Sequence, residues 1–178
     1  MSSMRYTMVA FFTFIIISCV QSQTFEEGDK LPDIVATGLD GKEISLSSLQ
    51  GKMVLIDFWA GWCAPCRKEN PAIIEAYKKY KDTSFKNGEG FTVFSVSLDT
   101  DKKMWASVVQ KDSLIWPYHV CDFKGFKGPI ASLYNVKSIP QSYLIDGDGI
   151  VVAVNPRGDA LESKLRRLKK AWYSNFGL

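Results

Sequence analysis

The order of apolar and polar positions along the chain first predicts its strands. Residues 33–46 hold two alternating stretches around Asp40-Gly41, the strongest short-range signal for a β-hairpin. Residues 53–59 form a continuous apolar run, as expected of a strand covered on both faces in a parallel sheet. Residues 91–98 predict a second strand of this kind. The chain therefore opens with a hairpin and continues with buried strands.

Helical spacing follows each buried strand. Residues 66–81 place apolar side chains three and four positions apart with lysines between them, which predicts a helix. A second helix over about residues 102–111, capped by residues 99–101, turns Met104, Trp105, Val108 and Val109 inward. The remaining predicted elements are a short helix near residues 130–134, a hairpin of residues 143–146 and 150–154, and a last helix over about residues 160–172. Strand–helix alternation followed by an antiparallel pair predicts an α/β fold: a mixed central sheet, helices on both faces and an N-terminal β-hairpin.

Composition limits the number of domains and the classes of partner. The chain has 178 residues, of which 46% are hydrophobic, enough for one domain with its own core but too few for two. The net charge of +3 comes from interspersed charges of both signs, so no nucleic-acid partner is predicted.

The first two dozen residues have the pattern of an export signal. Arg5 is the only charged side chain among the first 25 residues, and residues 8–17 are almost purely apolar. This run is shorter than the roughly 18 residues of a membrane-spanning helix, so we predict a signal peptide over residues 1–22. A signal anchor retained in the membrane is the alternative.

Cys19 leaves two ways of processing open. The sequence Ile16-Ile17-Ser18-Cys19 resembles a bacterial lipobox, in which residues 1–18 would be removed and Cys19 would carry a lipid anchor. Val20-Gln21-Ser22 instead offers a small-x-small cleavage site that would remove Cys19. Both place the mature domain, residues 24–178, outside the cytoplasm, either periplasmic or anchored to the membrane and facing the cell envelope.

The other cysteines suggest a working dithiol. Cys63, Cys66 and Cys121 are odd in number and do not fit a disulfide-stapled scaffold. A pair with two residues between them, plus one cysteine alone, indicates a redox pair and a small buried bystander.

The position of the pair favours thiol–disulfide exchange. Cys63 follows a buried strand and opens a helix, where backbone N–H groups and the helix dipole lower a thiol pKa from about 8.5 to roughly 3.5–7.5. We expect Cys63 to be exposed and to attack, and Cys66, one turn further in, to resolve the mixed disulfide. Pro65 suits a first helical turn because it lacks an N–H. Trp59 and Trp62 are predicted to shape the apolar surface that receives substrates.

A zinc half-site is the structural alternative for the two cysteines. His119 and Cys121 could complete it from one face of a strand, since zinc needs four converging ligands. Pro65 between the cysteines and Trp62 before them favour redox chemistry, so no metal and no cofactor are predicted.

Asp57 lies within the apolar run before the dithiol. Burial disfavours an ionised carboxylate, so its pKa should rise towards neutrality. Such a group could accept the proton of Cys66 during resolution. The alternative is that Asp57 faces a polar pocket and caps a backbone group.

Residues 56–66, Ile-Asp-Phe-Trp-Ala-Gly-Trp-Cys-Ala-Pro-Cys, resemble the active-site segment of thioredoxins, with Ala64-Pro65 in place of the usual Gly-Pro. The longer pattern is similar to the exported TlpA/ResA-like branch of the thioredoxin superfamily. It comprises the opening Gly28-x-x-x-Pro32-Asp33, the string from Trp62 to Pro71, and Ile139-Pro140, and it covers about residues 28–172. The resemblance implies a thioredoxin-like fold.

The resemblance also implies roles for further residues. Ile139-Pro140 falls where such proteins hold a cis-proline facing the dithiol, which would free the Ile139 backbone to pair with an extended substrate. An ordinary trans proline at the start of a strand is the alternative. Relatives also place an acidic side chain near the dithiol, for which Glu69 and Asp99 are candidates.

The function expected from these features is an extracytoplasmic disulfide reductase for exported proteins. The resemblance implies apocytochromes c as one class of client and a membrane electron donor for re-reduction. A disulfide oxidase or isomerase uses the same centre, because related couples span about −270 to −120 mV. A thiol peroxidase is an alternative, although peroxiredoxins place threonine where Ala60 precedes Cys63. A binding module that has lost the chemistry is disfavoured because Cys63, Cys66, Asp57 and Pro140 are all intact.

Overall fold

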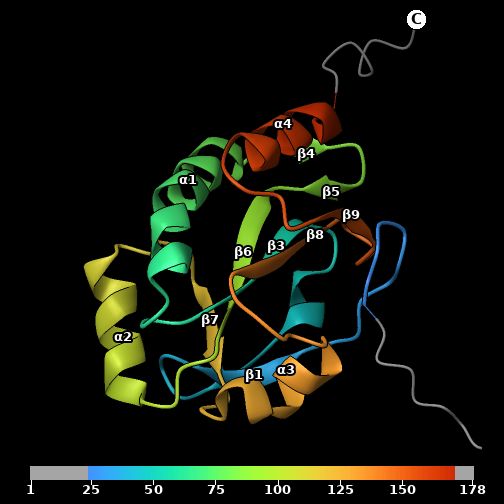
Figure 1. Cartoon of the computed structure of the whole chain (residues 1–178). Coiled ribbons are helices and arrows are strands. Elements are labelled where there is room, and N and C mark those ends of the chain that lie inside the picture. The colour runs from blue at the N-terminus through green and yellow to red at the C-terminus, as the bar shows by residue number, and fades with distance from the viewer. Residues whose placement is uncertain (1–23, 171–178) are drawn as a thin grey trace, which may run out of the picture.

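The buried strand predicted over residues 53–59 lies at the centre of a seven-stranded sheet. The computed structural model describes residues 24–170. Its main sheet has the order β2-β1-β7-β6-β3-β8-β9 (Figure 1). The strands of this sheet are β1 (Val35–Gly38), β2 (Glu43–Ser45), β3 (Met53–Trp59), β6 (Phe91–Ser97), β7 (Tyr118–Cys121), β8 (Gln141–Ile145) and β9 (Val151–Val154). The helices are α1 (Ala64–Tyr80), α2 (Lys102–Lys111), α3 (Pro129–Leu133) and α4 (Asp159–Leu168), with 3-10 turns η1 (Leu46–Leu49) and η2 (Gly125–Lys127).

Strand directions place the segment after β3 at one edge of the sheet. β3 pairs in parallel with β6 from Met53 opposite Phe91 to Trp59 opposite Ser97, and β6 pairs in parallel with β7. β8 runs antiparallel to β3 on its other side. The sheet is therefore mixed, as predicted. The carboxyl ends of β3, β6 and β7 meet at the edge from which the Cys63 loop leaves.

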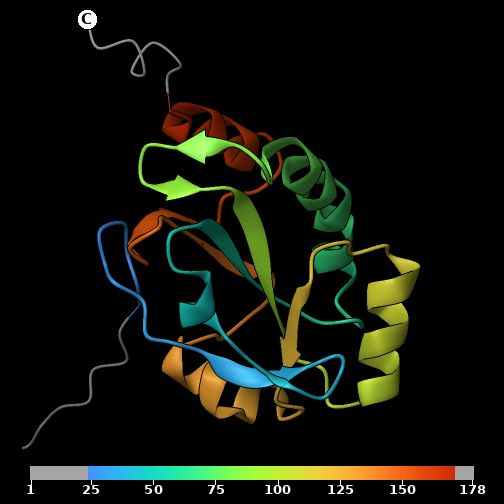
Figure 2. The same cartoon turned by 180° about the vertical axis from the view of Figure 1, so that it is seen from behind.

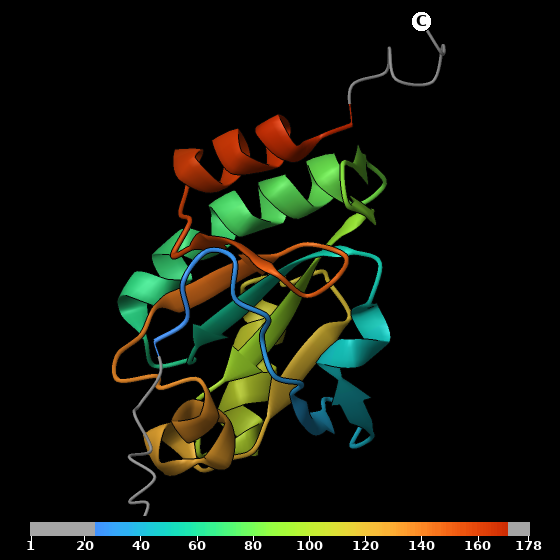
Figure 3. The same cartoon turned by 90° about the vertical axis from the view of Figure 1, so that its right-hand side faces the viewer.

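Helices cover both faces of this sheet (Figures 1 and 3). On one face, buried residues of α1, α2 and α4 form a cluster with Met53, Leu55 and Trp59 of β3. On the other face, α3 and η1 pack against Val54, Ile56 and Phe58. Successive side chains of a strand point to opposite faces, so this division assigns the side chain of Asp57 to the face covered by α1.

Several predicted elements match the structure closely. β1 and β2 form the N-terminal hairpin, with Val35 opposite Ser45 and Thr37 opposite Glu43. α2 spans residues 102–111, and the Asp101 carboxylate caps it by accepting from the Met104 N–H at 2.8 Å. Met104 was expected to point inward but is 48% exposed. Trp105, Val108 and Val109 form the inward face, and Met104 lies about 100° from Trp105 around the helix.

The last helix is shorter than predicted. α4 ends at Leu168 because Lys169 is extended and bridges to Phe85, while the Lys170 N–H donates to the Ser84 carbonyl. Ser84 and Phe85 form β4, which pairs with β5 (Gly88–Glu89) in a small hairpin beside α4 (Figure 2). This hairpin was not predicted from the sequence, although Asn87-Gly88 is a turn signal.

Some expectations fall on residues outside the described range. The predicted signal peptide over residues 1–22, the lipobox with Cys19 and the end of the last predicted helix at residue 172 lie there. Within residues 24–170, no helix has both the length and the apolar character needed to span a bilayer.

Candidate active site

The dithiol lies at the N-terminus of α1, directly after the central strand. Cys63 and Cys66 form a disulfide, with their Cα atoms 5.3 Å apart. Cys63 is the N-cap residue, and its Sγ accepts a hydrogen bond from the Cys66 N–H at 3.2 Å. In the reduced protein the same N–H faces a Cys63 thiolate, which it stabilises together with the helix dipole.

Both sulfur atoms are covered in this disulfide form. Cys63 is 4% exposed and Cys66 3%, so the prediction that Cys63 is exposed is wrong for the oxidised state. Trp62, at 54% exposure, lies at the surface just before the pair, and Pro65, between the two cysteines in the sequence, is also exposed. Trp59 is fully buried in the core and forms no part of that surface. Of the residues predicted to contact substrates beside the pair, Trp62 and Pro65 are therefore exposed, and their contact with a client stays a prediction.

Asp57 is a buried carboxyl on the same strand. It is 7% exposed and faces the α1 side of the sheet. Burial raises its pKa from 3.8 to about 7, while the charge of Arg157 lowers this pKa and the charge of Glu69 raises it. The raised pKa predicted from the sequence is confirmed. Near neutral pH such a group can both take and release a proton.

The Ile139–Pro140 peptide bond is cis. β8 begins at Gln141, which pairs with Phe58 of β3. This register places Pro140 next to Trp59, at the sheet edge from which the dithiol loop leaves. The trans alternative is excluded, and no backbone hydrogen bond joins Ile139 to another residue in the described part of the chain. Pairing of the Ile139 backbone with an extended substrate stays a prediction.

Arg157 connects three parts of the site and was not identified from the sequence. It lies in the loop after β9, and its guanidinium donates to the carbonyl of Pro140. A second nitrogen of this group lies 3.9 Å from the Glu69 carboxylate on α1. Of the two acidic candidates, Glu69 is the one whose charge raises the pKa of Asp57, and the charge of Arg157 opposes it. No local pattern marks Arg157, because its partners are distant in sequence.

Asp99, the other acidic candidate, holds the loop that leads to the dithiol. It follows β6 and is fully buried, and its Oδ2 accepts from the Gly61 N–H at 2.8 Å and from the Ser97 hydroxyl at 2.7 Å. A Cβ on residue 61 would lie 3.0 Å from the Val108 side chain, so glycine allows α2 to approach this closely. Asp99 therefore fixes the backbone two residues before Cys63.

His119 and Cys121 do not complete a zinc site. Burial lowers the pKa of His119 to about 4, and its Nε2 lies 3.2 Å from the Leu114 carbonyl. Cys121 is buried in β7, donates to the Asp99 carbonyl at 3.3 Å, and has a pKa raised to about 11 by burial. Within residues 24–170, no three potential ligands gather in one place. Both residues belong to the core around β7, a strand that the sequence suggested only as part of the zinc alternative.

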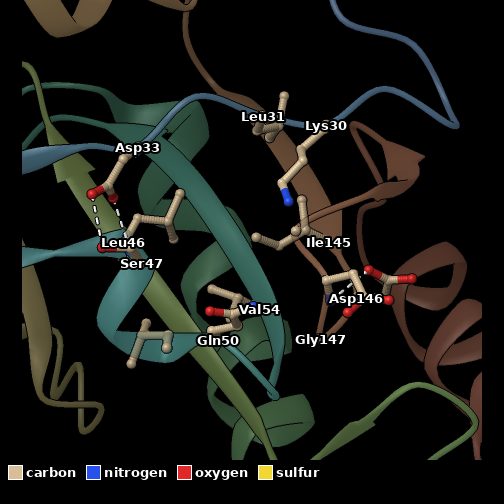
Figure 4. A pocket seen from close by; sticks show the side chains of 13 residues that line it. Lys30, Leu31, Asp33, Leu46, Ser47, Gln50, Val54, Ile145, Asp146 and Gly147 are labelled. Atoms are coloured by element: carbon tan, nitrogen blue, oxygen red, sulfur yellow. Dashed lines mark hydrogen bonds between the residues drawn. The ribbon is translucent and has the colours of Figure 1, made fainter.

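A separate pocket of about 250 Å³ lies away from the dithiol (Figure 4). Its walls include Leu31, Leu46 and Ile145, together with Val54 near the amino end of β3. None of the predicted site residues lines it. The pocket therefore lies towards the opposite end of β3 from the redox pair.

Comparisons with known proteins identify the family of this chain. Residues 27–154 match the model of the AhpC/TSA family. The chain is 38% identical over 125 residues to a thiol-disulfide oxidoreductase ResA of Bacillus cereus, a match covering 70% of this chain and 66% of that protein. It is 34% identical over 126 residues to the thioredoxin-like protein YneN of Bacillus subtilis, covering 71% and 69%.

Solved structures that superpose on this chain are also thiol-disulfide oxidoreductases. The thioredoxin domain of a thiol-disulfide oxidoreductase from Bacteroides vulgatus superposes with a TM-score of 0.74 at 31% identity, covering 83% of this chain and all of that one. A thiol-disulfide oxidoreductase from Bacteroides fragilis superposes with a TM-score of 0.70 at 31% identity, covering 79% and 99%. The predicted thioredoxin-like fold is thereby confirmed.

Proposed function

Because the chain belongs to the AhpC/TSA family and is a thioredoxin-fold thiol–disulfide oxidoreductase, we propose that it reduces disulfides in exported client proteins. The observation that carries this proposal is the Cys63–Cys66 pair at the N-terminus of α1, with Asp57 buried in the adjoining strand. The likeness to the ResA proteins supports thiol–disulfide exchange at this pair, and the signal peptide predicted over residues 1–22 supports export. The reductase direction is part of the proposal.

The proposed reaction proceeds in two exchanges. The Cys63 thiolate attacks one sulfur of the client disulfide, forms a mixed disulfide and expels the other client sulfur as a thiolate. Asp57 then takes the proton of Cys66, whose thiolate attacks the Cys63 sulfur and releases the second client thiol. Two electrons pass to the client and the Cys63–Cys66 disulfide closes. A membrane dithiol donor reopens it by the reverse exchanges.

Trapping the mixed disulfide tests the assignment of the two cysteines. Reduced Cys66→Ser protein mixed with a disulfide-bonded client should accumulate a covalent complex through Cys63, whereas Cys63→Ser should not. Cys121→Ala in the Cys66→Ser background is the control and should trap equally, because Cys121 is buried in the core. Trapping by Cys63→Ser alone would reverse the roles, and no trapping by either would rule out exchange.

The location and the client are further parts of the proposal. The apolar run after Arg5 supports export, and mass spectrometry of the envelope-extracted protein distinguishes a lipidated Cys19 from cleavage beyond it. For apocytochromes c as clients, deletion of the gene should lower holocytochrome c, and an added thiol reductant should restore it. Unchanged holocytochrome would exclude that client class.

The alternatives use the same residues differently. An oxidase or isomerase would run the same exchanges with a less reducing couple. A peroxidase needs polar groups that position peroxide beside the attacking sulfur. Ala60, three residues before Cys63, is fully buried and supplies no hydroxyl there.

A further inference from the structure

Two exposed aromatic rings pack against each other beside the dithiol. Trp62 immediately precedes Cys63 and is 54% exposed, and Phe126 of η2 is 41% exposed. Their ring centroids lie 6.3 Å apart at an angle of 52°. The pair leaves a contiguous apolar surface in water, which is typical of sites that receive another molecule.

The exposure of Phe126 is fixed by a structured turn. Gly125 is buried at φ +58°, and the Gly128 N–H donates to its carbonyl at 3.1 Å. The neighbouring Phe123 turns the other way and packs edge-on against Trp105, with ring centroids 5.6 Å apart. One turn therefore packs the half-buried Phe123 against the core and presents Phe126 at the surface next to Trp62.

The chain that continues from Phe126 carries only positive charges. Residues 124–140 include Lys124, Lys127 and Lys137 but no aspartate or glutamate. All three lysines are exposed, and none forms an ion pair with another described residue. This stretch runs from η2 through α3 to the cis bond at Pro140. The half-buried Asp122 lies just before this stretch, and its carboxylate accepts from the Lys124 N–H at 2.9 Å. The chain segment around Phe126 thus carries an exposed apolar ring and more lysines than carboxylates.

We propose that Trp62 and Phe126 together form a docking surface for a large apolar side chain next to the client's disulfide cysteine. The lysines of residues 124–137 favour clients with acidic residues further along the same extended segment. This inference rests on the proposed reductase function and names the chemistry of its substrates.

The test compares three disulfide-bonded peptides, each of the other two differing from the first in one feature. One peptide carries phenylalanine beside its cysteine and aspartates further along, a second has serine in place of the phenylalanine, and a third has lysines in place of the aspartates. The reduced protein should reduce the first with a kcat/KM about five to ten times that for the second, as expected for burial of part of an aromatic ring. The first should also exceed the third, by a margin that shrinks with added salt.

Substitutions at Phe126 test whether this residue causes the preference for phenylalanine over serine in the peptide. Phe126→Ala should bring the phenylalanine-to-serine ratio close to one, and Phe126→Leu should keep part of it. Leu39→Ala is the matched control, because Leu39 is also an exposed apolar residue, at 39% exposure. It lies in the β1–β2 turn, just after Gly38, which pairs with Val120 of β7. Since β1 and β7 are antiparallel, this turn lies away from the carboxyl end of β7 and from the dithiol. It should leave the ratio unchanged.

The outcomes separate the two proposals. Equal kcat/KM for the phenylalanine and serine peptides, or an unchanged ratio in Phe126→Ala, overturns the docking surface while reduction itself continues. Failure to reduce any of the three peptides overturns the reductase function instead.

Discussion

At the scale of single residues, the conflict between charge and burial at Asp57 has the largest consequences. Its pKa is about 7 in the folded protein, against 3.8 for a free side chain. Between about pH 4 and pH 7, Asp57 is therefore protonated in the folded state but ionised in the unfolded state. The free energy of unfolding consequently falls as the pH rises through this window. The full shift corresponds to roughly 4 kcal/mol.

Asp57→Asn removes this pH dependence. We expect the oxidised variant to be more stable than the wild type at pH 8, by about 2 to 4 kcal/mol, and close to it at pH 4. Urea unfolding of both proteins at the two pH values measures the difference. A variant that is less stable than the wild type at pH 8 would show that Asp57 is stabilised as an anion.

Arg157 and Glu69 should shift the proton affinity of Asp57 in opposite directions. Arg157→Ala removes a charge that lowers the Asp57 pKa, and Glu69→Gln removes one that raises it. The rate at which the second client thiol is released in a single turnover should rise with pH as Asp57 loses its proton. The pH at which this rate is half-maximal should therefore move up in Arg157→Ala and down in Glu69→Gln. Arg157→Lys keeps the charge and should move it less. Shifts in the same direction would refute this electrostatic account.

At the scale of elements, Asp99 links the end of β6 to the active-site loop. Asp99→Ala leaves the buried Gly61 N–H without its partner, which costs about 1 to 3 kcal/mol of stability. Asp99→Asn keeps an acceptor oxygen and should lose less. Amide hydrogen exchange at Gly61 reports the effect directly, since faster exchange in Asp99→Ala is expected. Unchanged exchange would show that the loop is held by packing against α2 alone.

The elements that the sequence predicted well are those with strong local signals. β3 is a seven-residue apolar run, and α2 has both a capping aspartate and a clear inward face. β7 was not among the predicted elements and entered only through the zinc alternative, because four residues with a histidine among them give little periodicity. The end of α4 was misplaced because pairing with β4, a contact between segments far apart in sequence, decides it.

At the scale of the whole molecule, the site combines one local string with distant chain segments. Cys63, Cys66 and Asp57 lie within ten residues and could be predicted together, because one strand and one helix start position them. Pro140 was identified only by resemblance. Glu69 and Asp99 were candidates whose contacts the sequence could not assign. Arg157 and Phe126 were not identified, because the loop after β9 and the turn η2 come close to the dithiol only in the folded chain.

The most direct test of the central claim is the reduction potential of the Cys63–Cys66 couple, measured by equilibrating the mature domain in defined thiol buffers. A reductase of exported proteins requires a value near −250 mV or below, about that of thioredoxin, and this is the value we predict. A value near −120 mV would contradict the account, because the couple would then oxidise its clients rather than reduce them.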